Sequence, residues 1–168
     1  DSLSIEVPSL VEDAEAATQA DENALVQVAL SEAETDKLLR DCPAAYRTQI
    51  NELLLTALWI AVNRWTGQTS MRVWMEGHGR EDLFEQLDLT QSVGWFTTMY
   101  PLTLHSQQSD LACIIKTIKE QYRELPNKGI GYGIVKYLQK DESLAQDFSN
   151  DIIFNYLGQL DQTVNNDN

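Results

Sequence analysis

The residues whose types and spacing could support chemistry lie in the stretch MRVWMEGHGRE, which begins at Met71. Met71, Val73 and Met75 recur at every second position, as is typical of one face of a β-strand. Glu76 therefore stands where a strand meets a Gly-His-Gly turn. A carboxylate that is half desolvated by apolar neighbours at such a rim is suited to proton transfer. The alternative is a surface turn in which Glu76 pairs with Arg80 in water, and local chemistry alone favours that ion pair.

The charge of the chain is concentrated near its start. The formal net charge is -14, and residues 1–36 hold ten acidic residues and no Lys or Arg. We predict an acidic lead-in or inter-lobe linker over residues 1–24, one compact lobe over residues 25–161 and a frayed tail over residues 162–168. The sequence has no basic cluster that could neutralise phosphates, which argues against nucleic-acid binding.

The two cysteines, Cys42 and Cys113, are far apart and lack metal-ligand spacing. We expect buried free thiols rather than a disulfide. The sequence shows no signal peptide and no apolar run long enough to cross a bilayer, so we expect a cytoplasmic protein without membrane contact.

The first half of the chain indicates one short strand and two helices. Residues 25–30, LVQVAL, suit a strand. Ser31 and Glu34 form a capping-box pattern for a helix that should end at Cys42-Pro43. Thr48 is the expected N-cap of the next helix. Apolar residues cover nearly the whole circumference of residues 50–65, so we expect a buried, central core helix there.

The second half combines extended and helical patterns. Residues 92–105 favour extended structure, and Pro101 indicates an edge strand or a strand break. Residues 109–125 form an amphipathic helix. The glycines at alternate positions of residues 129–133 could cradle a phosphate, but no strand precedes them, so tight packing is favoured. Residues 151–158 suit a last strand. Because strands and helices are mixed rather than alternating, the pattern favours an α/β sandwich.

Four segments, EGHGRE, VGWFTTMYP, LPNKGIGYG and FNYLGQ, occur in that order at residues 76–81, 93–101, 125–133 and 154–159. Together with INELLLTAL at residues 50–58, they resemble the epimerisation domains of nonribosomal peptide synthetases, which are members of the condensation-domain superfamily. The resemblance covers most of residues 25–161. It implies a chloramphenicol acetyltransferase-like lobe, in which a mixed sheet is packed with helices.

Such domains have two lobes with the active site in a tunnel between them, and this chain resembles the C-terminal lobe alone. The HHxxxDG motif of the family's N-terminal lobe is absent here, since the only histidines are His78 and His105. The resemblance therefore implies a partner lobe that carries this motif, and we expect the chain alone to be inactive. Gln91-Ser92 departs from the Arg-Thr pair that is usual before VGWF.

The reaction that the resemblance implies is inversion from L to D at the α-carbon of an aminoacyl or peptidyl thioester. A peptidyl carrier protein presents this substrate on its phosphopantetheine arm, and no metal or directly bound cofactor is expected. Inversion needs two acid/base groups across the substrate and donors for an enolate oxygen. By resemblance, Glu76 is one acid/base group and the histidine of the partner lobe is the other. Asn155 and Tyr156 would donate to the enolate or orient Glu76.

Other residues of these segments have structural interpretations. His78, between two glycines, is expected to fix a turn, and Arg80 to form a rim ion pair or latch with the acid that follows it. Trp95 and Phe96 are expected in the core or the tunnel wall. Tyr132 is expected to pack with its hydroxyl on a polar partner.

Two other functions remain open from the sequence. One is a condensation domain that forms peptide bonds on the same fold, although VGWFT and FNYLG resemble the epimerising branch. The other is a non-catalytic module that recruits carrier proteins. A lobe without its partner is expected to expose an apolar face, which predicts self-association.

Overall fold

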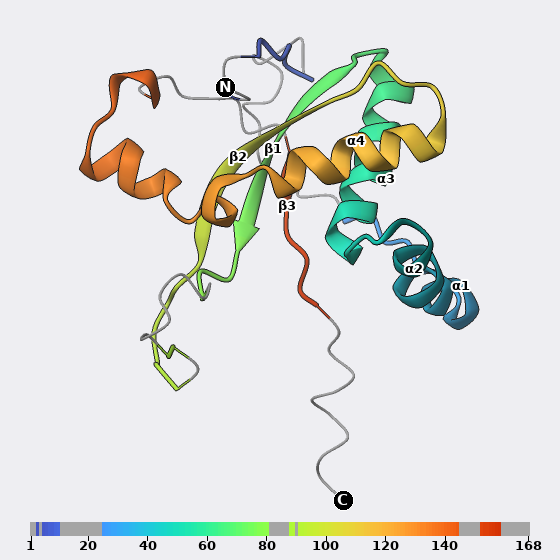
Figure 1. Ribbon diagram of the computed structural model, residues 1–168, viewed down its shortest axis with the longest axis horizontal. Coiled ribbons are helices and arrows are strands. Elements are labelled where there is room, and N and C mark those ends of the chain that lie inside the picture. Colours follow the sequence, from blue (N-terminus) through green and yellow to red (C-terminus); the bar gives the residue numbers. More distant parts are fainter. Residues whose placement is uncertain are drawn as a thin grey trace, which may run out of the picture. The chain divides into compact units, whose positions relative to one another are not determined.

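Figure 1 shows the computed structural model of the chain, which describes residues 3, 5–10, 25–80, 88–89, 91–144 and 152–158. Three strands form one sheet in the order β2-β1-β3, so β1 is central. These strands are β1 (Ser70–Gly77), β2 (Thr98–His105) and β3 (Ile153–Phe154). β3 runs parallel to β1.

The chain divides into two compact units. The first comprises Asp1–Arg72 and Thr103–Glu124, and the second comprises Val73–Leu102 and Leu125–Asn168. The first unit ends at Arg72 within β1 and begins again at Thr103 within β2. Each of these two strands therefore contributes residues to both units.

Helices build the first unit. They are α1 (Glu32–Asp36), the π-helical turn η3 (Lys37–Asp41), α2 (Cys42–Tyr46), α3 (Ile50–Thr66) and α4 (Leu111–Arg123). α3 packs against α4 (Figure 1). Leu55, Met71, Leu104 and Ile118 are fully buried in the core of this unit. Removal of such large aliphatic side chains from water is the main favourable contribution to folding.

The capping box at Ser31 is confirmed. The Glu34 amide donates to Ser31 Oγ at 3.3 Å, and the Ser31 amide donates to Glu34 Oε2 at 2.9 Å. Hydrogen bonds from the Ser31 hydroxyl and amide lower the pKa of Glu34. The predicted end at Pro43 is wrong, because the chain passes through η3 into α2. Pro43 lies in the first turn of α2, where a missing amide hydrogen costs little.

The strand predicted for residues 25–30 is wrong, because these residues form no regular secondary structure. Leu25 is 83% exposed and Val28 is 90% exposed. A strand needs a neighbour for its backbone hydrogen bonds, and β-propensity alone does not supply one.

The N-cap of α3 also differs from the prediction by one residue. It is Gln49, whose amide donates to Glu52 Oε2 at 2.8 Å, rather than Thr48.

Burial of α3 on all sides is also wrong. Leu53, Leu55 and Trp59 are buried, but Trp65 is 73% exposed and Ala61 is exposed too. The helix is covered on the side that packs against α4 and open on another. α3 therefore has more apolar surface than the other elements of the first unit cover.

The amphipathic helix is confirmed as α4, with Asp110 as its N-cap. The Cys113 amide donates to Asp110 Oδ2 at 3.0 Å, and this bond lowers the pKa of Asp110. Arg123 is exposed near the end of α4, and its guanidinium bonds the carboxylate of Glu52. The Arg123 Nε to Glu52 Oε1 distance is 2.6 Å, and the Glu52 side chain is 1% exposed. This ion pair ties α4 to α3.

In the second unit, Val73 and Met75 of β1 are buried, which confirms the predicted alternation. The extended segment is shorter than predicted, because β2 begins at Thr98 and residues 92–97 form no strand. Pro101 lies in β2 at an edge of the sheet, as expected. The short helical segments here are η4 (Pro126–Gly129), η5 (Ile134–Leu138) and η6 (Glu142–Leu144).

The tight-packing interpretation of the glycine segment is confirmed at Gly129 alone, because a Cβ atom at Gly131 would meet nothing within 4 Å. The φ of Gly129 is +78°, and a Cβ atom at this position would overlap the ring of Tyr100. Tyr100 is 4% exposed, so its ring has little room to move away. Only glycine satisfies both conditions without strain.

The remaining expectations are corrected in part. The last strand covers only Ile153–Phe154. Cys42 and Cys113 are free, but Cys42 is half-buried and Cys113 is exposed, so the expected burial is wrong. In the described part of the chain, no helix is long and apolar enough to cross a membrane. The predicted domain boundaries stay a prediction, and residues 11–24 and 159–168 lie outside the described residues.

Candidate active site

Glu76 is the next-to-last residue of β1, the central strand. Side chains alternate along a strand, so Glu76 shares a face with Trp74 and lies opposite the buried face of Val73 and Met75. Its side chain is half-buried. Among the described residues, its carboxylate has no hydrogen bond or ion pair, so the alternative pairing with Arg80 is not found there.

Asn155 and Tyr156 follow β3 directly. Trp74 lies opposite Ile153, and Met75 lies opposite Phe154. The same register, carried one residue further, sets Glu76 opposite Asn155. Directly facing positions of neighbouring strands lie about 5 Å apart. Asn155 lies one residue beyond the end of β3, so we infer from this register that it lies near Glu76, 79 positions away in the sequence. Asn155 is exposed and Tyr156 is half-buried.

The turn after Glu76 is stabilised from within. The Arg80 amide donates to His78 Nδ1 at 3.0 Å, a contact that agrees with a turn-fixing role for His78. Gly79 has a φ of +66°, and a Cβ atom there would overlap the carbonyl oxygen of Phe96. The turn therefore approaches the segment before β2 closely.

Among the described residues, the hydrogen-bond acceptors of the Arg80 guanidinium lie in the same segment. Its guanidinium donates to the carbonyl oxygens of Leu89 and Ser92, the latter at 2.9 Å. It also lies 4.3 Å from the ring centroid of Phe96, within cation–π range. The acid expected to pair with it, Glu81, lies outside the described residues, as do residues 82–87.

Trp95 does not belong to the core, because it is 90% exposed. Phe96 is half-buried beneath Arg80. The role of both residues as a tunnel wall stays a prediction.

Tyr132 packs edge-on against Trp74, with ring centroids 5.9 Å apart and an interplanar angle of 79°. Its hydroxyl oxygen is buried and has no hydrogen-bond partner among the described residues, so the expected polar partner is not found there. Lys136 Nζ lies 6.0 Å from the Tyr132 ring centroid and 5.7 Å from that of Tyr137. Two aromatic rings therefore lie within cation–π range of this ammonium group.

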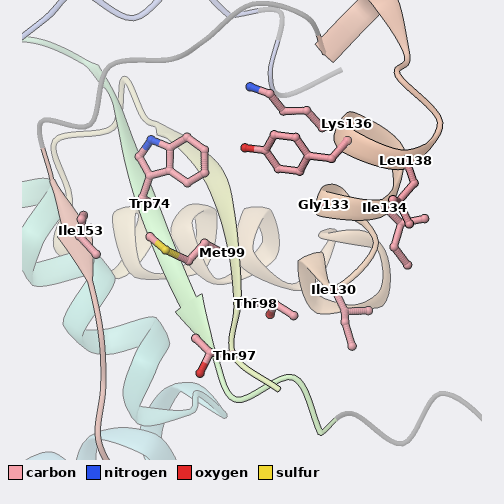
Figure 2. A pocket seen from close by; sticks show the side chains of 11 residues that line it. Trp74, Thr97, Thr98, Met99, Ile130, Gly133, Ile134, Lys136, Leu138 and Ile153 are labelled. Carbon is pink, nitrogen blue, oxygen red and sulfur yellow. The ribbon is translucent and has the colours of Figure 1, made fainter. Parts of the chain in front are cut away.

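A pocket of about 850 Å³ lies in the second unit (Figure 2). Pockets that hold small molecules fall in this size range. The lining side chains are mostly apolar or aromatic, with two threonines and one lysine: Trp74, Thr97, Thr98, Met99, Ile130, Gly133, Ile134, Lys136, Tyr137, Leu138 and Ile153.

Sequence reasoning missed this pocket. The sequence did contain one indication of it. Trp74 alternates with the buried residues of β1, so its side chain lies on the other face of the sheet. The register with Ile153 was not readable from the sequence. No group of three or more His, Cys, Asp or Glu side chains among the described residues could hold a metal ion.

The family model for the condensation domain matches residues 3–168. The chain belongs to the condensation-domain family. This condensation-family chain is 50% identical over 140 residues to Bacitracin synthase 2 of Bacillus licheniformis. It is 47% identical over 137 residues to Bacitracin synthase 3 of the same organism. The two alignments cover 83% and 81% of this chain, but only 5% and 2% of those proteins.

Solved structures confirm the expected fold class. The condensation-family chain is similar to the epimerization domain from the third module of tyrocidine synthetase B, with a TM-score of 0.70 and 42% identity. This match covers 77% of this chain and 30% of that chain. The first condensation domain of the calcium-dependent antibiotic synthetase shares the fold, with a TM-score of 0.50 and 18% identity over 62% of this chain and 23% of that chain.

These matches make the chain a condensation-superfamily domain of nonribosomal peptide synthetases with a chloramphenicol acetyltransferase-like fold. Condensation-type domains act on substrates that carrier proteins present on phosphopantetheine, without a directly bound cofactor.

Proposed function

We propose that the chain is the C-terminal lobe of an epimerisation domain, which inverts L to D at the α-carbon of a carrier-bound aminoacyl or peptidyl thioester. The observation that carries this proposal is the 42% identity to an epimerization domain at a TM-score of 0.70. The condensation domain of the calcium-dependent antibiotic synthetase is only 18% identical. The sequence likeness to this epimerization domain supports the proposed assignment to the epimerising branch.

The chemistry assigns a role to Glu76. A thioester acidifies the α-hydrogen, and inversion requires that one group removes this proton while another returns a proton to the opposite face. The Glu76 carboxylate is half-buried at the end of the central strand and has no partner among the described residues. It is thus available to accept or donate a proton at the α-carbon. The net reaction exchanges one α-proton and changes no other bond.

The enolate that forms between the two proton transfers needs donors aimed at its oxygen. Asn155 follows β3 at the position facing Glu76, and its side-chain amide carries two N–H donors. Tyr156 adds a hydroxyl from the next position. We assign both residues to the enolate oxygen or to the orientation of Glu76.

The second acid/base group in this proposal is a histidine of the HHxxxDG motif in a partner lobe. The substrate arrives on the phosphopantetheine arm of a peptidyl carrier protein. His78 does not serve as this group, because its Nδ1 accepts a hydrogen bond within the turn that follows Glu76.

The experiment uses a complete domain that contains this chain and a partner lobe, with carrier-bound aminoacyl thioesters in deuterated water. We expect deuterium to enter the α-position and the D-isomer to accumulate. Peptide-bond formation with a second loaded carrier, without exchange, would assign the chain to a condensation domain instead. Carrier binding without either reaction would assign it to a recruiting module.

A further inference from the structure

We propose that the 850 Å³ pocket of the second unit receives the side chain of the residue whose α-carbon is inverted, and that it selects apolar side chains. This inference rests on the proposed function and adds the substrate class. Three features carry it: the place of the pocket beside Glu76, its lining, and its charge.

The pocket adjoins the candidate acid/base residue through the sheet. Trp74 and Ile153 both line it, and they face each other across β1 and β3. Glu76 is two residues further along β1 and therefore on the same face as Trp74, and Asn155 is the residue that follows β3. Two residues of strand span about 6.6 Å. A substrate α-carbon at Glu76 would thus have its side chain within reach of the Trp74–Ile153 end of the pocket.

The lining presents apolar surface that no described part of the chain covers. Ile134 is 52% exposed, Met99 is 43% exposed and Ile153 is 58% exposed. Apolar residues gathered in a hollow and left open to water are typical of a ligand site. Figure 2 shows Trp74, Met99 and Ile153 on the sheet side of the pocket, with Ile130 and Ile134 opposite them.

The wall formed by Trp74 is held in place, because Tyr132 packs edge-on against its indole at 5.9 Å. A fixed aromatic wall presents a large contact area to an aliphatic or aromatic side chain. Rigid walls also let the pocket discriminate by size.

The charge of the pocket lining favours apolar over cationic substrate side chains. The charged residue among the described lining is Lys136, and no Asp or Glu lines the described part of the pocket. Among the described lining residues, a cationic side chain would meet one ammonium group and no carboxylate, which disfavours its entry when water is excluded.

The test substitutes Ile134→Trp in the complete domain and measures deuterium uptake from carrier-bound alanyl, leucyl, phenylalanyl and lysyl thioesters. With the unsubstituted domain, we expect faster exchange from leucyl and phenylalanyl thioesters than from the lysyl thioester. Because the indole narrows the pocket, we expect Ile134→Trp to lower the phenylalanyl-to-alanyl rate ratio by at least about tenfold.

Leu111→Trp is the matched control, because Leu111 is 56% exposed, close to Ile134 at 52%, and lies on α4 in the first unit. We expect this control to leave the ratio unchanged. A ratio that Ile134→Trp does not alter, while exchange persists, would overturn the side-chain pocket alone. Absence of exchange from every thioester with the unsubstituted domain would overturn the proposed function and this inference with it.

Discussion

Glu76 has the half-buried position at a strand end that its sequence pattern suggests, but among the described residues it lacks the ion pair that local chemistry favours. Its position at the end of β1 keeps it half-buried, and the guanidinium that local chemistry pairs with it is used elsewhere. Arg80 donates to two backbone carbonyls and lies over Phe96. Arg80 therefore holds the turn after β1 against the segment before β2. The Glu76 carboxylate is left without an ion pair among the described residues. The local pattern favours an ion pair between Glu76 and Arg80, but it does not show the backbone carbonyls to which Arg80 donates. These carbonyls belong to residues 9 and 12 positions further along the chain.

Gly129 provides a residue-scale test of the second unit. We expect Gly129→Ala to lower the free energy of unfolding by about 1–3 kcal/mol, because its Cβ would overlap the buried Tyr100 ring. The φ of +78° adds strain to any side chain there. Urea denaturation of the chain measures this change.

Gly131→Ala is the matched control for Gly129→Ala, two positions along the same segment. A Cβ atom at Gly131 meets nothing within 4 Å, and its φ is not in the left-handed region. We expect little loss of stability. Equal losses from both substitutions would contradict the packing argument for Gly129.

At the scale of elements, the sequence predicted the features that depend on interactions between residues close together in the chain. The alternation of β1, the capping box at Ser31 and the body of α4 all follow from spacing within a few residues. The LVQVAL strand failed because a strand depends on a neighbour that its own sequence does not specify. The facing of Glu76 and Asn155 depends on the parallel register of β1 and β3, which no motif contains.

The contact between α3 and α4 yields an element-scale prediction. The hydrogen bond from Arg123 to Glu52, followed by their charge attraction, raises the pKa of Arg123, so the guanidinium stays charged. Arg123→Met would leave the Glu52 carboxylate, which is 1% exposed, without its countercharge. Arg123 is itself 43% exposed, but the carboxylate that its removal leaves behind is buried, and a buried charge without a partner is destabilising. We expect the thermal midpoint to fall by several degrees in a circular-dichroism melt.

Arg40→Met is the control for this effect. Arg40 pairs with Asp36 on the surface of the first unit, and its side chain is 77% exposed. Exposed pairs contribute little to stability. A midpoint that falls equally for both variants would show that the Arg123–Glu52 pair does not hold the two helices together.

At the scale of the whole molecule, α3 carries more apolar surface than its own unit covers. Ala57, Ala61 and Trp65 recur every four residues on one exposed side. We therefore expect the isolated chain to self-associate, with sedimentation coefficients that rise with concentration. Trp65→Ser should weaken this association about ten- to hundredfold, since burial of an aromatic side chain is worth roughly 1.5–3 kcal/mol.

Trp95→Ser is the comparison for this measurement, because Trp95 is also exposed, at 90%, but lies in the second unit. A larger effect of Trp95→Ser than of Trp65→Ser would place the self-associating surface elsewhere than on α3. Sedimentation as a monomer across a wide concentration range would contradict the prediction.

The most direct measurement is α-hydrogen exchange by the complete domain with Glu76→Gln. Glutamine keeps the size of the side chain but cannot transfer the proton, so we expect exchange to fall by about 10²- to 10⁴-fold. Glu142→Gln, at an exposed position of the same unit, should retain the unsubstituted rate. Exchange at an unchanged rate in the Glu76→Gln domain would contradict the role of Glu76 as the acid/base group.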